Sequence, residues 1–205
     1  MEEQQAGDMD LDSTIELLHA KKDKSYLEGM KRFGIDTSGV HALGVSIPEL
    51  RRLARKLKPN HALALELWNT GIHEARILAS MIDNPGGVTL RQINMWVNDF
   101  ASWDLCDQVC GNLFDRTPFA ISCAKKFSSR KREFVKRAGF VLMAEFAVHG
   151  KTAPDEVFVE FLSIIEDHAW DERNFVKKAV NWALRQIGKR NRYLQGKAIE
   201  TARRI

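Results

Sequence analysis

The residues of this chain with the clearest chemical potential lie in segment 102–110, which reads SWDLCDQVC. Trp103 precedes Asp107 by four positions, so in a helix the two side chains share one face. The quadrupole of an indole ring attracts a cation, and a carboxylate balances the charge of that cation. The spacing therefore favours a site that stabilises positive charge. The simpler alternative is that Trp103 is a core aromatic.

Other motifs for chemistry are incomplete. The His-Glu pair at 73–74 lacks a second histidine at position 77, which excludes a zincin-type zinc site. Cys106 and Cys110 have no partner ligands at zinc-site spacing, so we expect buried free thiols. Neither a glycine-rich phosphate loop nor a deaminase signature occurs in the sequence. We therefore expect no metal and no cofactor.

The elements that must position Asp107 are predicted to be helices. Apolar residues recur at helical spacing along almost the whole chain, and strand alternation is absent. Segment 46–49 has the pattern of a capping box with Pro48 in the first turn, and segment 89–92 repeats this pattern. Turn residues at 84–87 and Gly150 mark helix ends. The fold class is therefore predicted as all-α.

The predicted helices also resemble one another. Segments 74–81, 136–143 and 177–184 each begin with charged residues and a small residue and continue into an apolar stripe. Periods of about 30–45 residues in an all-helical chain are typical of stacked helix pairs. We predict an α-solenoid of stacked HEAT-like helical hairpins over residues 13–205, a single domain with a concave basic face. Residues 1–12 are expected to form a flexible acidic tail, with a short cap from Leu11 to Leu18 as the alternative.

Charge is distributed unevenly along the chain. The first 20 residues hold six acidic residues and no Lys or Arg, so 31 basic residues face 21 acidic ones in the remainder. The basic residues gather in two clusters, Arg130, Lys131, Arg132, Lys136 and Arg137 in one and Lys177, Lys178, Arg185, Lys189, Arg190 and Arg192 in the other. Each cluster taken alone fits a solvated helix face as well as it fits a binding site for an anionic partner. Two clusters in successive helical units favour a nucleic-acid partner.

These residues carry a resemblance to a known family. Three segments match in order and at similar spacing: Trp103-Asp104-x-x-Asp107, the stretch FVKRA at 134–138, and the stretch KKAVNWALR at 177–185. Together with segment 43–51 they cover roughly residues 25–195. The chain is similar to the AlkD-like family of DNA alkylation-repair glycosylases, which are all-helical proteins built from HEAT-like repeats. Ser102 departs from the pattern, since some relatives carry an aromatic residue there.

The resemblance implies an activity and a set of site residues. Asp107 would be the catalytic carboxylate, and Trp103 and Trp182 would contact the sugar and backbone of the damaged nucleotide. Arg137 would contact the DNA backbone. Further DNA contacts are expected from the neighbouring cations Arg185, Lys136, Lys177, Lys178, Lys189 and Arg190. The substrate would be double-stranded DNA with purines alkylated at N3 or N7, and the product an abasic site.

Two other functions stay open. The chain could be a non-catalytic repeat protein that binds distorted or branched DNA, or a helical scaffold for an acidic protein. The aromatic–carboxylate set favours catalysis, and the basic clusters favour DNA over a protein partner. We expect a monomer that is neither secreted nor bound to a membrane. It would be cytoplasmic and near the nucleoid in a bacterium or archaeon, or nuclear in a eukaryote.

Overall fold

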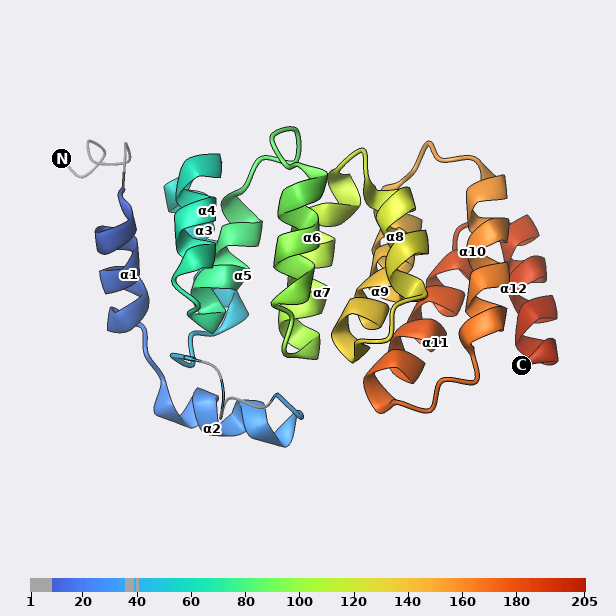
Figure 1. Cartoon of the computed structure of the whole chain (residues 1–205), viewed down its shortest axis with the longest axis horizontal. Helices are drawn as coiled ribbons and strands as arrows, with labels where there is room; N and C mark the ends of the chain where they lie inside the picture. The colour runs from blue at the N-terminus through green and yellow to red at the C-terminus, as the bar shows by residue number, and fades with distance from the viewer. Residues whose placement is uncertain (1–8, 36–38, 40) are drawn as a thin grey trace. The chain divides into compact units, whose positions relative to one another are not determined.

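The computed structural model describes residues 9–35, 39 and 41–205 (Figure 1). Within these residues the regular elements are helices, apart from one isolated bridge that joins His41 to Ile72. The all-α prediction is therefore confirmed. The chain divides into two compact units, Met1–Val88 and Thr89–Ile205. The single domain expected for residues 13–205 stays a prediction.

The N-terminal tail can be judged only in part. Residues 1–8 lie outside the described part of the chain. Leu11 already begins a helix, so the last residues of the expected tail are helical. The side chain of Asp10 caps this helix by accepting a hydrogen bond of 3.0 Å from the backbone nitrogen of Ser13. An N-terminal cap of this kind satisfies a backbone donor that has no partner inside the helix.

The first unit is a small helical assembly. Its helices in the described residues are α1 (Leu11–Ala20), α2 (Lys24–Arg32), α3 (Ile47–Leu57), α4 (His61–Asn69) and α5 (His73–Ile82). The helix α5 contacts α1, α3 and α4. Its buried Glu74 accepts hydrogen bonds from the backbone nitrogens of Leu43, Gly44 and Val45, at 2.8, 2.7 and 3.3 Å. This carboxylate therefore fixes the loop that leads into α3.

One predicted capping box differs in the structure. Ser46 is the N-cap of α3 and Pro48 lies in its first turn, but the Ser46 side chain makes no capping hydrogen bond. Glu49, the expected second half of the box, instead pairs with Arg52 at 2.6 Å. This salt bridge uses the carboxylate that a capping box would direct to the backbone nitrogen of Ser46. At the other predicted box, Thr89 accepts from the Gln92 nitrogen at 3.2 Å, as expected.

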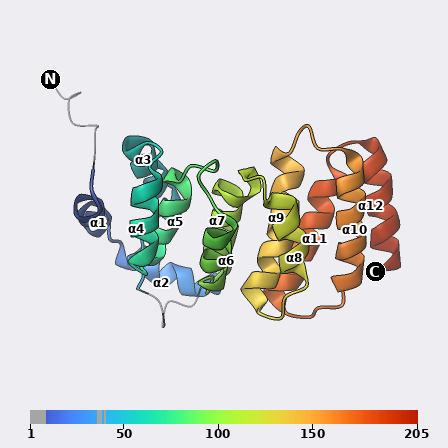
Figure 2. The same ribbon diagram turned by 45° about the horizontal axis from the view of Figure 1, so that its top comes forward.

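The second unit is a row of helices around α9 (Figures 1 and 2). Its elements are α6 (Leu90–Asn98), α7 (Trp103–Asn112), the 3-10 helix η1 (Phe114–Arg116), α8 (Ala120–Ser128), α9 (Glu133–His149), α10 (Asp155–His168), α11 (Asn174–Gly188) and α12 (Arg192–Arg204). The helix α9 contacts α7, α8 and α11. The helix α9 therefore connects α7, α8 and α11 to one another.

Packing around α9 is close. Every residue from 135 to 144 of this helix is buried. A β-carbon added at Gly139 would lie 2.3 Å from the backbone nitrogen of Ser128, so glycine is needed for the approach of α8. The buried stretch includes two cations, Lys136 and Arg137. Because buried charges require partners, these two residues predict ion pairs with the neighbouring helices.

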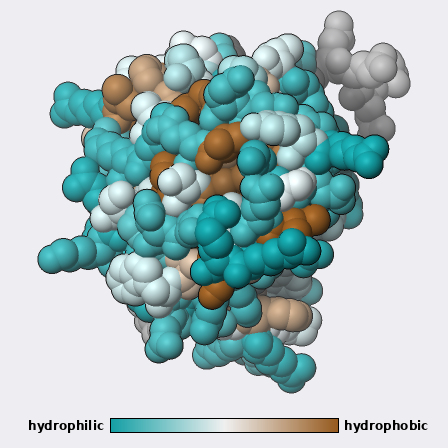
Figure 3. All heavy atoms as spheres, turned by 90° about the vertical axis from the view of Figure 1, so that its right-hand side faces the viewer, coloured by the Kyte–Doolittle hydropathy of each residue, from teal (hydrophilic) through white to brown (hydrophobic). Residues whose placement is uncertain are grey.

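The C-terminal end of the second unit presents a largely hydrophilic surface. Figure 3 shows only small hydrophobic patches among hydrophilic side chains on this face. Exposed Ile199 and Ile205 belong to this end of the chain. Terminal units of a helical repeat row need such a polar outer face. In the described residues, no helix is both long and apolar enough to span a bilayer.

Candidate functional site

The centre of the candidate site is an ion pair between α7 and α9. The guanidinium of Arg137 donates to both carboxylate oxygens of Asp107, from Nε to Oδ1 at 2.9 Å and from Nη2 to Oδ2 at 2.7 Å. The side chains are 6% and 16% exposed, respectively. The paired geometry of the two planar groups fixes the position and orientation of the carboxylate. The structure brings these two predicted site residues, which lie 30 positions apart in sequence, into direct contact.

Two buried cysteines hold α7 in register with α9. The Sγ of Cys106 lies 3.7 Å from the carbonyl oxygen of Phe134, and the Sγ of Cys110 lies 3.9 Å from that of Ala138. Both thiols are free and buried, as predicted, and burial raises the pKa of each. They therefore act as small packing residues on the face next to Asp107.

A second contact fixes Arg137 from the opposite side. Its Nη1 donates to the backbone carbonyl of Phe175 at 2.5 Å, which joins α9 to α11. The rings of Phe134 and Phe175 meet beside this contact, with centroids 5.5 Å apart. The guanidinium thus links three helices of this unit, α7, α9 and α11. Sequence reasoning missed Phe175 because its contribution is a backbone oxygen, which leaves no residue-type signal.

The electrostatics of the pair depend on burial. Burial raises the pKa of Asp107 above its ordinary value, while the hydrogen bonds and charge of Arg137 oppose this shift. Arginine stays protonated in proteins, so the carboxylate keeps a permanent positive partner. A carboxylate has about four lone-pair directions, and Arg137 uses two of them. Asp107 can therefore still accept a hydrogen bond or face a second positive charge.

The two predicted tryptophans lie on α7 and α11, two of the helices that contact α9. Trp103 is the first residue of α7, one turn before Asp107 on the same face, and is partly exposed. Trp182 lies on α11, two turns after Phe175, and is also partly exposed. Among the described residues, no hydrogen bond or ring contact joins Trp182 to Asp107 or Arg137. The contacts of both indoles with DNA stay predictions.

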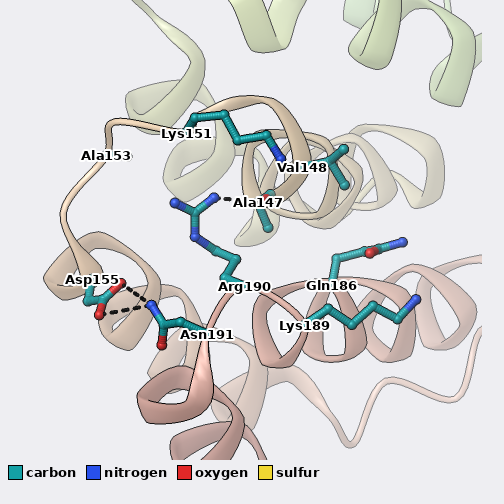
Figure 4. Close-up of a pocket in the computed structure, with 9 residues that line it drawn as sticks. All are labelled: Ala147, Val148, Lys151, Ala153, Asp155, Gln186, Lys189, Arg190 and Asn191. Atoms are coloured by element: carbon teal, nitrogen blue, oxygen red, sulfur yellow. Dashed lines mark hydrogen bonds between the residues drawn. The ribbon is translucent and has the colours of Figure 1, made fainter.

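The cations predicted to bind DNA fall into two groups. Those with exposed side chains are Lys177, Lys178, Arg185 and Lys189, all on α11 or at its end. Lys136 is instead buried and pairs with Asp171 at 2.8 Å. Arg190 donates to the carbonyls of Ala147 and Gly150 at 2.6 and 3.0 Å, in the polar hollow of Figure 4. The charges of Lys136 and Arg190 thus face protein atoms. The four exposed cations of the first group make no such contact in the described residues.

One cluster in the described part of the chain has ligand types that suit a metal ion. It contains Asp115, Glu145 and His149, whose ligand atoms all lie within 4.8 Å of one another. Burial raises the pKa of both carboxyl groups. However, Nδ1 of His149 already makes a short hydrogen bond with Oδ2 of Asp115, and the charge of Arg116 lies near both acids. We therefore interpret the cluster as a hydrogen-bonded pair of Asp115 and His149. A metal ion could bind there only if this hydrogen bond were broken.

Comparisons with known proteins agree with this architecture. The model of a family described as DNA alkylation repair enzyme matches residues 14–204. Uncharacterized protein Lin0241 of Listeria innocua serovar 6a is 26% identical over 165 residues, which cover 79% of this chain and 71% of that protein.

A solved structure gives the same fold. It is described as "a new family of proteins related to the HEAT-like repeat DNA glycosylases with affinity for branched DNA structures" and matches with a TM-score of 0.84 at 21% identity. The match covers 96% of this chain and 83% of that one. The likeness confirms the predicted HEAT-like repeat fold. The concave basic face remains a prediction.

Proposed function

Because the chain belongs to the DNA alkylation repair enzyme family, we propose that it is a monofunctional DNA glycosylase. Membership supports an enzyme of DNA repair. The finer assignment is that it releases cationic N3- and N7-alkylated purines from double-stranded DNA. The observation that carries this assignment is the partly buried carboxylate of Asp107, fixed by Arg137 and still able to accept a further partner.

The chemistry requires little beyond a fixed negative charge. Alkylation at N3 or N7 gives the purine a positive charge and makes it a good leaving group. When the bond from C1′ to the base nitrogen breaks, its electron pair leaves with the base, and positive charge moves to the sugar. Water then adds to C1′ and loses a proton, which gives an abasic site.

The proposed role of Asp107 is to stabilise the sugar cation. A preorganised charge in a partly buried site acts more strongly than one in water, because the surroundings screen it less. Its free lone pairs are also suited to orient the attacking water. Arg137 is a positioning residue in this proposal, since its hydrogen bonds hold the carboxylate in place. Its expected contact with the DNA backbone stays a prediction.

The aromatic and basic residues have supporting roles in the proposal. Trp103 shares a helix face with Asp107, and its indole is proposed to favour the same positive charge. Trp182 is proposed to contact the sugar and backbone of the damaged nucleotide. The exposed cations of α11 are proposed to bind phosphates. Among the described residues, no side-chain partner of Lys177, Lys178, Arg185 or Lys189 competes with DNA in the way that Asp171 competes for Lys136.

A second function is favoured by one observation. The solved protein with the same fold is described as having affinity for branched DNA. A non-catalytic binder of branched or distorted DNA would use the same basic surface. In that case the Asp107–Arg137 pair would serve only to join α7 to α9.

Release of free base separates the two functions. Duplex DNA containing 7-methylguanine is incubated with excess protein, and the liberated base is measured against the spontaneous rate. We expect release well above the spontaneous rate, together with abasic sites that alkali cleaves. Binding to branched DNA with no release above background would favour the second function.

A further inference from the structure

The second unit carries an exposed tryptophan outside the site described above. Trp68 and Trp96 are buried and Trp103 and Trp182 are partly exposed, whereas Trp170 is 71% exposed. Trp170 lies between α10 and α11. Tryptophan is enriched at binding interfaces, because burying its large ring is strongly favourable.

The indole is nevertheless held in a defined position. Its Nε1 donates to the carbonyl of Asp167 at 2.7 Å. The ammonium of Lys136 lies 4.9 Å from the ring centroid, as in a cation–π contact. The ring is thus fixed from the protein side while most of its surface stays accessible. A ligand that stacks on it would lose little affinity to ordering of the side chain.

An ion network supports this arrangement. Asp171 pairs with Lys136 at 2.8 Å and accepts two hydrogen bonds from the side chain of Arg173, at 2.9 and 2.6 Å. Arg173 also donates to the carbonyl of Lys131 at 2.6 Å. These contacts tie the loop before α11 to the loop before α9. The platform around Trp170 is therefore built by two segments that lie about 40 residues apart in sequence.

The platform borders a hollow of about 690 Å³ with positive charge. Four cations and two carboxylates line this hollow. The cations are Arg130, Lys131, Lys136 and Arg173, and the carboxylates are Asp171 and Glu172. Asp171 is already paired with Lys136. An anionic ligand with a flat aromatic group would match both the charge and the exposed ring.

A second hollow continues the positive surface. It has a volume of about 590 Å³ and shares the residues 129–131 with the first. Four cations line it and no carboxylate does, the cations being Lys126, Arg130, Lys131 and Arg132. Lys126 and Arg132 are held by hydrogen bonds to Asn94 and Asn98, at 2.9 and 3.1 Å. Successive positive hollows of this kind suit a chain of phosphates better than a single anion.

We propose that Trp170 and the basic loop 129–132 form a binding site for single-stranded DNA. One unpaired base stacks on the indole of Trp170, its phosphate faces Arg130 and Lys131, and the next phosphates follow Lys126 and Arg132. Aromatic stacking beside a basic groove is how proteins bind single strands without sequence preference. The inference rests on the proposed function in one respect, that the partner of this protein is DNA. It adds that the DNA carries unpaired nucleotides.

The test compares fluorescently labelled substrates of equal length by anisotropy. Oligothymidylate and a forked duplex with one unpaired arm supply unpaired bases, and a blunt duplex supplies none. We expect Trp170→Ala to weaken binding of the first two by about tenfold, which is the usual loss for one stacked base. Binding of the blunt duplex should change less than about twofold. Trp170→Phe should retain most of the affinity, because a phenyl ring also stacks.

Tyr193→Ala is the matched control. Tyr193 is an exposed aromatic of the same unit, 55% exposed, with Lys197 at 6.0 Å from its ring, and it lies outside both hollows. Its loss should leave all three affinities unchanged. A second variant, Arg130→Ala with Lys131→Ala, should weaken single-strand binding and reduce its salt dependence. Melting curves check that each variant is folded.

The outcomes distinguish this inference from the proposed function. Equal affinity of wild type and Trp170→Ala for the unpaired substrates overturns the inference, as does an equal loss on the blunt duplex. Trp170→Ala should still release base from a methylated duplex without unpaired arms. If wild type releases no base but Trp170→Ala loses single-strand affinity, the glycosylase proposal fails and the single-strand site stands.

Discussion

Two adjacent residues of α9, Lys136 and Arg137, form buried ion pairs with carboxylates from different parts of the unit. The pKa values of the two carboxylates are shifted in opposite directions. Arg137 pairs with Asp107 of α7, and Lys136 pairs with Asp171 before α11. Burial raises the pKa of Asp107 above its ordinary value. The pKa of Asp171 is held well below its ordinary value, first by Arg173 and then by Lys136.

The difference lies in how many donors each carboxylate has. Asp107 is bonded by a single guanidinium, whereas Asp171 is bonded by two cations and by the backbone nitrogen of Arg173. The charge of Asp171 therefore stabilises the fold. The charge of Asp107 is kept at a cost, and such incompletely compensated groups gather at functional sites. The Asp171 pair therefore supports the fold, and the Asp107 pair is the one to which we propose a chemical role.

The largest effect on stability is expected when Arg137 is removed. Arg137→Met leaves Asp107 buried without its cation and should lower the free energy of unfolding by about 3–5 kcal/mol. The exposed pair Lys125–Glu160 gives a matched control, because its side chains are 36% and 52% exposed. Lys125→Met should cost less than about 1 kcal/mol. Urea denaturation measures both values.

A double variant checks the origin of that loss. Adding Asp107→Asn to Arg137→Met removes the uncompensated charge and should recover part of the stability. No recovery would mean that packing of the Arg137 side chain, and not the buried charge, accounts for the effect. In that case the electrostatic contrast between the two pairs would need revision.

A smaller effect is expected in the pH dependence of stability. The lowered pKa of Asp171 means that its contribution is fully present above the unfolded pKa and is lost as pH falls through the folded pKa. The loss caused by Asp171→Asn should therefore be largest near pH 7 and should shrink below about pH 4. The raised pKa of Asp107 has the opposite sign, because the folded state takes up a proton first.

Wild type should consequently gain stability relative to Asp107→Asn as pH falls through the folded pKa of Asp107 towards its unfolded pKa. Urea denaturation of wild type and both variants over a series of pH values provides the data. The two difference curves should slope in opposite directions. Parallel curves would contradict the contrast on which the assignment of Asp107 depends.

The sequence predicted the fold more fully than the site. Helix periodicity and repeat spacing identified an all-helical HEAT-like fold, because each repeat must bury an apolar stripe against its neighbours. The family resemblance named both Asp107 and Arg137 as site residues. It gave no sign that they pair directly. Arg137 meets Asp107, 30 residues away, because of how α7 and α9 pack. Helical periodicity does not specify which side chains of two packed helices come into contact.

The basic residues illustrate the same limit. Cluster counting treated Lys136 and Arg190 as DNA contacts, equal to the exposed Lys177. Lys136 is buried with a carboxylate 35 residues away, and Arg190 bonds the carbonyls that end α9. Whether a cation faces solvent or protein depends on residues distant in sequence. Trp170 was missed for a related reason, since exposure of a tryptophan is a property of the packed fold.

The central claim is that Asp107 performs chemistry whereas Asp171 supports the fold. The most direct test is the single-turnover rate of 7-methylguanine release by wild type, Asp107→Asn and Asp171→Asn, each saturating the DNA at a temperature where all are folded. We predict that Asp107→Asn loses about 10²–10³ in rate, as for one preorganised electrostatic contact, while Asp171→Asn stays within about threefold of wild type. Release by Asp107→Asn at the wild-type rate would contradict the account.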